Sequence, residues 1–243
     1  MSSIYSRTRM LIGEDGVKKL KAAHVAVFGL GGVGSYTAEA LARSGVGELT
    51  LVDNDTVTES NLNRQLYALH STLGMPKTEA AEQRVLDINP ACRVHTVCER
   101  YLPENAADFF EGARWDYIAD AVDTMVAKID LAVRAREHGI PLIACMGTGN
   151  KFDASRFRVS DIYETSVCPI CRVLRRELKK RGVPALRVVW SDEEPMRPAA
   201  TDEPTNRRAT PGSMPYVPPV AGMLLAGEIV TALTTAVGEP SAK

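Results

Sequence analysis

A glycine-rich turn between a predicted strand and a predicted helix is the feature that most constrains the fold of this chain. Residues 24–28 are β-rich, and the alanine- and leucine-rich segment 35–45 ends on a glycine, as a capped helix does. A second β-rich run, 48–53, follows at once. The three segments predict a βαβ unit, and this setting makes a glycine turn a nucleotide-binding signal. The turn carries four glycines: Gly29, Gly31, Gly32 and Gly34.

The same alternation of strand-like and helix-like segments continues to about residue 150. Helical patterns alternate with short β-rich runs at 77–88, 93–98, 106–110, 117–121, 128–138 and 141–145. Regular alternation of this kind gives parallel strands with helices packed on either side. It predicts an α/β fold: a Rossmann-like, doubly wound and mostly parallel sheet with helices on both faces.

The pattern changes in the last third of the chain. We expect a single domain with two parts, a nucleotide-binding core at 1–150 and a C-terminal substrate-binding part at 151–243. Short strands are predicted in the second part at 157–159 and 188–190. Residues 191–219 are rich in Pro, Asp, Glu and Arg and have little periodicity, which predicts a long and mobile loop.

The overall charge and the apolar segments exclude several classes of protein. The 29 Lys and Arg residues balance 30 Asp and Glu, so neither a disordered chain nor a histone-like binder fits. The N-terminus lacks the apolar run of a secretory signal, and we therefore expect a cytoplasmic protein. The apolar segment 220–237 contains Glu228 and follows Pro218 and Pro219, which predicts a buried amphipathic helix and no membrane span.

The five cysteines are scattered and odd in number, which favours reduced thiols over disulfides. Cys92, Cys98 and Cys145 lie in or beside predicted strands, where a buried thiol acting as a small hydrophobic group is the commoner case. Cys168 and Cys171 form the only Cys-x-x-Cys pair. A tetrahedral zinc site needs four ligands, so one pair alone leaves any metal or redox role open.

Polar and charged residues after the second predicted strand indicate which nucleotide the turn accepts. The turn alone fits NAD, FAD or ATP. Asp53 ends that strand, where a carboxylate can bind ribose hydroxyls. Amide, guanidinium and ammonium groups follow, and they suit a triphosphate because they neutralise charge on the α-phosphate and the departing pyrophosphate. These groups, with a second acid beside them, are Asp55, Asn61, Arg64, Gln65 and Lys77.

These motifs, together with Asp120-Ala-Val-Asp123, resemble the adenylating core of the ThiF, MoeB and ubiquitin-activating enzyme superfamily over roughly residues 5–150. The resemblance implies that ATP and Mg²⁺ bind here. It implies that Asp53 holds the ribose and that Asp123 positions both Mg²⁺ and ATP. The residues that it implies as phosphate contacts are Asn61, Arg64 and Lys77.

The superfamily often completes each active site with an arginine from a second subunit. Arg7 stands on a short N-terminal segment, ahead of the first predicted helix and far in sequence from the phosphate-binding residues. We therefore expect a homodimer in which Arg7 completes the partner's ATP site, although Arg9 is an equally good candidate. The residues expected to act in catalysis are Arg7, Arg64, Lys77 and Asp123.

The C-terminal half is similar to one branch of the superfamily, the tRNA threonylcarbamoyladenosine dehydratases. The likeness includes the segments 69–77, 146–150, 188–195 and 217–222, and it covers nearly the whole chain. It implies ATP-dependent dehydration, by cyclisation, of N6-threonylcarbamoyladenosine in tRNA. The carboxylate of the threonylcarbamoyl side chain is adenylated, and loss of AMP lets the side chain close. The implied partner is tRNA that carries this nucleoside.

Three other functions remain open. The first is an adenylyltransferase that activates the C-terminal glycine of a ubiquitin-like sulfur carrier, but such enzymes usually carry two Cys-x-x-Cys pairs. The others are a nucleotide-binding module without turnover and an NAD-dependent oxidoreductase. The sequence also leaves open which tRNAs are substrates and which group acts as base in the cyclisation.

A basic helix is predicted at 168–181, downstream of the nucleotide-binding core. Seven basic residues stand against one acid between Arg172 and Arg187, in a chain whose net charge is −1. Arg172, Arg176 and Lys180 share one stripe by their spacing. The stripe is either a solvated helix face or a surface for tRNA phosphates, and we expect the second.

Overall fold

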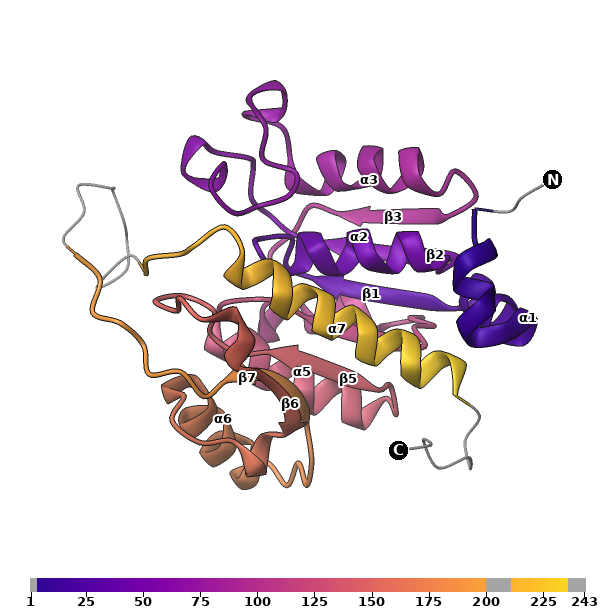
Figure 1. The fold of residues 1–243 in the computed structure, drawn as a ribbon. Helices are drawn as coiled ribbons and strands as arrows, with labels where there is room; N and C mark the ends of the chain where they lie inside the picture. Colours follow the sequence, from indigo (N-terminus) through magenta and orange to yellow (C-terminus); the bar gives the residue numbers. More distant parts are fainter. Residues whose placement is uncertain (1–3, 200–210, 236–243) are drawn as a thin grey trace.

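One sheet with helices on both faces makes up the described part of the chain, which is residues 4–199 and 211–235 of a computed structural model (Figure 1). The strands lie in the order β3-β2-β1-β4-β5-β7-β6. All neighbours pair in parallel except β6, which pairs antiparallel with β7 at one edge. The strands are β1 His24–Phe28, β2 Glu48–Val52, β3 Arg93–Val97, β4 Tyr117–Asp120, β5 Leu142–Cys145, β6 Phe157–Asp161 and β7 Arg187–Ser191.

The helices divide between the two faces and bury separate apolar clusters. Residues of α2, α3 and α7 pack into one core, while α4, α5 and α6 pack on the other face. The predicted doubly wound, mostly parallel fold is thus confirmed, and the ends of its elements differ from the predicted ones by three residues at most. The helices are α1 Ser6–Ala22, α2 Gly34–Ser44, α3 Lys77–Ile88, α4 Ala106–Phe110, α5 Met125–Glu137, α6 Pro169–Lys180 and α7 Val217–Thr234.

The predicted glycine cap of α2 is confirmed by its geometry. Gly45 has φ 94°, in the left-handed region that glycine tolerates best, and its N–H donates to the carbonyl of Ala42 at 3.1 Å. The N–H of Val46 then donates to the carbonyl of Leu41 at 3.2 Å. This cap turns the chain directly into β2, so the βαβ unit has almost no connecting loop.

The first helix corrects the expectation for Arg7. Arg7 lies inside α1, one residue after its start, and not on a segment ahead of the first helix. The helix is interrupted by Gly13, whose φ is 70°, and such glycines weaken a helical pattern in the sequence. Because α1 leads straight into the amino end of β1, it lies at the edge of the sheet where the parallel strands begin (Figure 1).

Helix α7 crosses one face of the sheet and packs against α2 and α1 (Figure 1). It begins at Val217, so Pro218 and Pro219 belong to its first turn, where their missing N–H groups cost nothing. The expected helix 220–237 therefore starts too late, and residues 236–237 lie outside the described chain. By length and composition α7 could cross a membrane, but its face toward α2 is buried in the core.

The described C-terminal part has longer strands than its sequence predicts. Strands β6 and β7 extend to Asp161 and Ser191, beyond the predicted 157–159 and 188–190. The expected loop 191–219 is shortened by β7 and α7, and its residues 200–210 lie outside the described chain. The described remainder, 192–199 and 211–216, forms no helix or strand.

Candidate functional site

A cavity of about 980 Å³ lies where β1, β2, β4 and β5 end. This edge is where doubly wound sheets bind ligands, because the loops after parallel strands meet there. Of the glycines expected to bind nucleotide, Gly34 is absent from the cavity wall; Arg7, which is expected to act on the partner's site, does not line the cavity of its own chain. The predicted residues that line it are Gly29, Gly31, Gly32, Asp53, Asp55, Asn61, Arg64, Gln65, Lys77 and Asp123.

Two glycines of the turn are required by close backbone packing. Gly29 has φ 87°, and a Cβ atom there would lie 2.8 Å from the carbonyl oxygen of Ala121. At Gly34 a Cβ atom would lie 1.7 Å from the carbonyl oxygen of Gly29. Gly34 therefore lets α2 start directly against the turn. Its role is helix packing, which explains why the motif includes it although it does not face the cavity.

The Asp53 carboxylate joins the end of β2 to the glycine turn. Its Oδ2 accepts the N–H of Leu30 at 2.6 Å, and its Oδ1 accepts the N–H of Asp55 at 2.8 Å. Two backbone donors fix the orientation of the carboxylate at the cavity wall. A carboxylate has about four acceptor positions, so it can still receive hydroxyl donors from a ligand.

Lys77 begins α3 and is tied to Asp55. Its Nζ lies 2.8 Å from Asp55 Oδ2, and its side chain is 6% exposed against 61% for Asp55. The ammonium group is thus held inside the cavity wall by a carboxylate that faces solvent. An incoming phosphate can replace this exposed partner without leaving the lysine unpaired.

The loop between β2 and α3 holds Asn61 and Arg64. Asn61 is buried at the end of the 3₁₀ helix Glu59–Asn61, and its Oδ1 accepts the N–H of Thr58 at 3.2 Å. Arg64 Nη1 donates to the Ser60 carbonyl at 2.8 Å and to Asn63 Oδ1 at 2.9 Å. These local bonds hold the guanidinium group at the cavity wall, where it can contact phosphate.

A buried ion pair lies under the cavity, and the sequence did not indicate it. Asp120, the last residue of β4, is fully buried, and its Oδ1 lies 2.9 Å from Nζ of Lys128 in α5. Its Oδ2 has no hydrogen-bond partner among the described residues. Burial raises the pKa of Asp120, and Lys128 opposes this shift. Lys128 lines the cavity, so the pair is part of its floor.

Asp123 is exposed at the cavity, on the irregular segment that follows β4. Its Oδ1 accepts the hydroxyl of Thr124 at 3.3 Å. Asp120 and Asp123 belong to one Asp-x-x-Asp motif, yet one is buried and ion-paired while the other faces the open cavity. Of these two aspartates, only Asp123 therefore presents a carboxylate that a solvated cation could reach.

Cys168 and Cys171 lie beside the cavity at the start of α6, and both thiols are buried and free. A hydrogen bond from the Cys171 thiol lowers the pKa of Cys168, and the same bond raises the pKa of Cys171. Within the described residues, no other His, Cys, Asp or Glu joins them as a third metal ligand. Of the remaining cysteines, Cys92 and Cys145 are buried as expected, but Cys98 is exposed because it follows the end of β3.

Helix α6 carries the predicted basic stripe, but part of its charge is compensated. Glu177 lies 3.2 Å from Arg176, 3.1 Å from Lys180 and 2.8 Å from Arg181. Hydrogen bonds from Arg181 and Lys180 lower the pKa of Glu177 to about 2. Arg175 is turned toward the protein, where it donates to the carbonyl oxygen of Thr165 at 2.8 Å.

Comparisons with known proteins agree with this fold. The ThiF family model matches residues 5–243. The tRNA threonylcarbamoyladenosine dehydratase of Bacillus subtilis (strain 168) is 43% identical over 236 residues, which are 93% of this chain and 92% of the relative. The crystal structure of the Escherichia coli enzyme TcdA in complex with ATP has a TM-score of 0.85 and 32% identity, with 94% and 93% of the two chains covered.

A relative with a different activity matches a shorter part of the chain. The adenylyltransferase and sulfurtransferase UBA4 of Vanderwaltozyma polyspora is 38% identical over 139 residues, which are 57% of this chain and 31% of that protein. The dehydratases, by contrast, match over the C-terminal part as well. The chain belongs to the ThiF family, and within it to the group that contains the tRNA threonylcarbamoyladenosine dehydratases of these two bacteria.

Proposed function

We propose that this protein is an ATP-dependent dehydratase that cyclises N6-threonylcarbamoyladenosine in tRNA through an acyl-adenylate. The observation that carries the proposal is the cavity that Asp53, Arg64 and Lys77 line together, in a fold similar over 94% of the chain to a dehydratase solved with ATP. A carboxylate, a guanidinium and an ammonium group in one cavity suit the ribose and phosphates of ATP.

The reaction divides into two steps, and the substrate supplies both nucleophiles. A carboxylate oxygen of the threonylcarbamoyl side chain attacks the α-phosphorus of ATP, and pyrophosphate leaves. The carbamoyl group of the same side chain then attacks the activated carboxyl carbon, and AMP leaves with that oxygen. Arg64 and Lys77 stabilise the charge that builds up on the phosphates, while Asp53 holds the ribose.

Asp123 is the residue that we assign to Mg²⁺. Its exposed carboxylate lines the cavity and offers a hard oxygen ligand, which is the chemistry that Mg²⁺ prefers together with phosphate oxygens. When bound, the ion neutralises phosphate charge during adenylation. Gln65, Asn61 and Asp55 lie around the same cavity and complete the nucleotide site.

A homodimer with Arg7 acting on the partner's site is part of the proposal. Arg7 lies in α1, at the amino edge of the sheet, whereas the cavity of the same chain lies at the carboxyl edge. The neighbouring Met10 and Leu11 are 84% and 88% exposed. Apolar side chains this exposed favour burial against a second copy of the chain, and that contact would carry Arg7 to the partner.

We assign a different ligand to each of the two parts of the chain. Residues 1–150 hold nucleotide, and residues 151–243 bind the tRNA, with α6 as the surface for its phosphates. Both tRNA and ATP are abundant in the cytoplasm, and the cysteines of the described chain are all free, which fits a reducing compartment. We therefore place the reaction in the cytoplasm.

Nucleoside mass spectrometry tests the proposal directly. Purified protein is incubated with ATP and tRNA that carries threonylcarbamoyladenosine, and the nucleosides are then analysed. We expect the modified nucleoside to lose the mass of one water, with one AMP released per product. AMP formation that requires a ubiquitin-like protein ending in Gly-Gly, and not tRNA, would replace this function with sulfur-carrier activation.

A further inference from the structure

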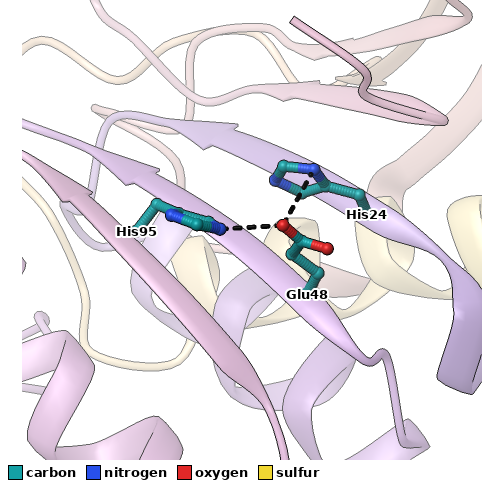
Figure 2. Close-up of side chains that lie close together, drawn as sticks. All are labelled: His24, Glu48 and His95. Atoms are coloured by element: carbon teal, nitrogen blue, oxygen red, sulfur yellow. Dashed lines mark hydrogen bonds and ion pairs between the residues drawn. The ribbon is translucent and has the colours of Figure 1, made fainter.

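Two histidines and a glutamate lie together at the beginnings of three neighbouring strands (Figure 2). His24 opens β1, Glu48 opens β2, and His95 is the third residue of β3. The parallel register pairs His24 with Glu48 and places His95 opposite Thr50. Because side chains alternate along a strand, all three point to the same face of the sheet. This cluster lies at the edge opposite the nucleotide cavity.

The distances within the cluster are close to those of a metal centre. His95 Nε2 lies 2.8 Å from Glu48 Oε1, and His24 Nδ1 lies 3.5 Å from the same oxygen. The three ligand atoms all lie within 4.8 Å of one another. In a tetrahedral zinc site, with bonds of about 2.0–2.1 Å, neighbouring ligand atoms are about 3.3 Å apart. Small side-chain rotations bring all three atoms to that spacing.

The contacts around the cluster orient its ligands. His24 Nε2 lies 2.8 Å from the hydroxyl of Thr50, which also accepts the Trp115 indole N–H at 3.3 Å. When Nδ1 binds a metal, Nε2 carries the ring proton and donates it to this hydroxyl, the outer contact common around metal-bound histidines.

The charges around the cluster permit a cation to enter. Arg93 binds Glu48 through the second oxygen, Oε2, so Oε1 stays directed at the histidines. Arg93 is 74% exposed on its side chain and can move toward solvent. The carboxylate of Asp116, which accepts the backbone N–H of His24, adds a second negative charge nearby. His95 is half exposed, which leaves a path for the ion.

We propose that His24, Glu48 and His95 form a zinc site that joins β1, β2 and β3 and leaves the fourth position to water. Two imidazoles and one carboxylate favour Zn²⁺ over Mg²⁺, which prefers oxygen ligands alone. Binding is restricted to the folded state, because the three residues are brought together only by the strand register. Zinc therefore stabilises the sheet at this edge and takes no part in the reaction at the opposite edge.

Calorimetry with Zn²⁺ tests the site on tag-free protein that has been treated with EDTA and dialysed. We expect one equivalent of Zn²⁺ per chain and a rise in melting temperature on binding, and excess Mg²⁺ should not displace this Zn²⁺. His95→Gln removes one exposed ligand and lowers the zinc affinity at least tenfold. His70→Gln, an exposed histidine outside the cluster, is the matched control and leaves the affinity unchanged.

A further variant separates the cluster from the cysteine pair. Cys168→Ser removes a thiol that could bind zinc elsewhere, and we expect it to leave the calorimetric signal unchanged. Zinc binding that disappears with Cys168→Ser, or that persists unchanged in His95→Gln, would overturn the proposal. Absence of any zinc binding would show that the cluster is a hydrogen-bonded ion network only. The dehydratase assay does not enter this test, so either proposal can fail without the other.

Discussion

Lys77 and Asp55 are joined twice, by an ion pair of 2.8 Å between Nζ and Oδ2 and by a hydrogen bond of 3.0 Å from the Lys77 N–H to the Asp55 carbonyl. The backbone bond fixes where α3 begins, and the ion pair fixes where its first side chain points. The start of the helix and the position of the ammonium group at the cavity wall are therefore set by one residue, three positions after β2 ends.

Lys77→Ala should lower the rate of AMP formation by roughly 100- to 1,000-fold, the cost typical of removing one group that stabilises transition-state charge. Asp55→Asn should cost less, because the amide still accepts a hydrogen bond from the ammonium group. AMP release with modified tRNA measures both. Lys18→Ala, on the exposed surface of α1, serves as the control. Equal losses of AMP formation in the Lys77 and Asp55 variants would mean that the ion pair serves only to hold the loop between β2 and α3.

Asp123→Ala should abolish turnover while leaving the melting temperature within about 2 °C of the parent, because an exposed side chain away from the core contributes little to stability. The carboxylate is assigned to Mg²⁺, so Asp123→Asn should be nearly as inactive. Asp15→Ala, at another exposed aspartate, in α1, is the control. Near-normal AMP formation by the Asp123 variants would remove this residue from the metal site.

Lys128→Met should destabilise the fold by about 3–5 kcal/mol at pH 8, since it leaves the buried Asp120 carboxylate without its partner. Loss of the partner raises the pKa of Asp120 further, so the folded variant takes up a proton before the parent does as the pH falls. The free energy of unfolding of the variant should therefore be closer to that of the parent at pH 5 than at pH 8. Urea unfolding at both pH values measures it, and a deficit that does not depend on pH would contradict this account.

Arg7→Ala and Lys77→Ala chains should each be inactive alone and should recover activity when mixed. In a mixed dimer, one site receives an intact Lys77 from its own chain and an intact Arg7 from the partner. Random mixing gives half mixed dimers with one working site each, so about a quarter of the parent activity returns. Arg9→Ala replaces Arg7→Ala in a parallel experiment. If activity recovers in the mixture with Arg9→Ala and not in the mixture with Arg7→Ala, Arg9 is the residue that completes the partner's site.

Charge reversal on α6 should weaken tRNA binding and spare ATP. Arg175 is left in place, because it bonds Thr165 and its loss would disturb the fold. The Michaelis constant for tRNA should rise strongly, while that for ATP stays constant. In the protein without substitutions, the affinity for tRNA should fall on the order of a thousandfold between about 50 and 200 mM salt. The four exposed residues to change to Glu are Arg172, Arg176, Lys179 and Lys180.

Two exposed basic residues away from α6, Lys18 and Arg114, provide the matched reversal control. If α6 is the surface that binds tRNA, the variant with both Lys18 and Arg114 changed to Glu keeps a normal Michaelis constant for tRNA. A tRNA dependence that is unchanged in the α6 variant would identify the stripe as a solvated face balanced by Glu177.

The sequence by itself determined the features that depend on neighbours along the chain. The βαβ unit, the glycine turn and the helix cap at Gly45 follow from local backbone preferences and from the strand and helix periods. The parallel order of strands follows from their alternation with helices, and it brings Asp53 and Asp123 to one edge of the sheet. These residues could therefore be placed at one site before any coordinates were known.

Only the tertiary structure decided relationships between segments that are far apart. Asp120 and Lys128 pair because α5 packs over the end of β4, and His24, Glu48 and His95 meet because three strands share one register. No local pattern specifies such contacts, since they depend on which face of each element is buried. Burial likewise separated the two acids of one motif, because the last residue of a central strand is enclosed by its neighbours while a residue three positions later has left the sheet.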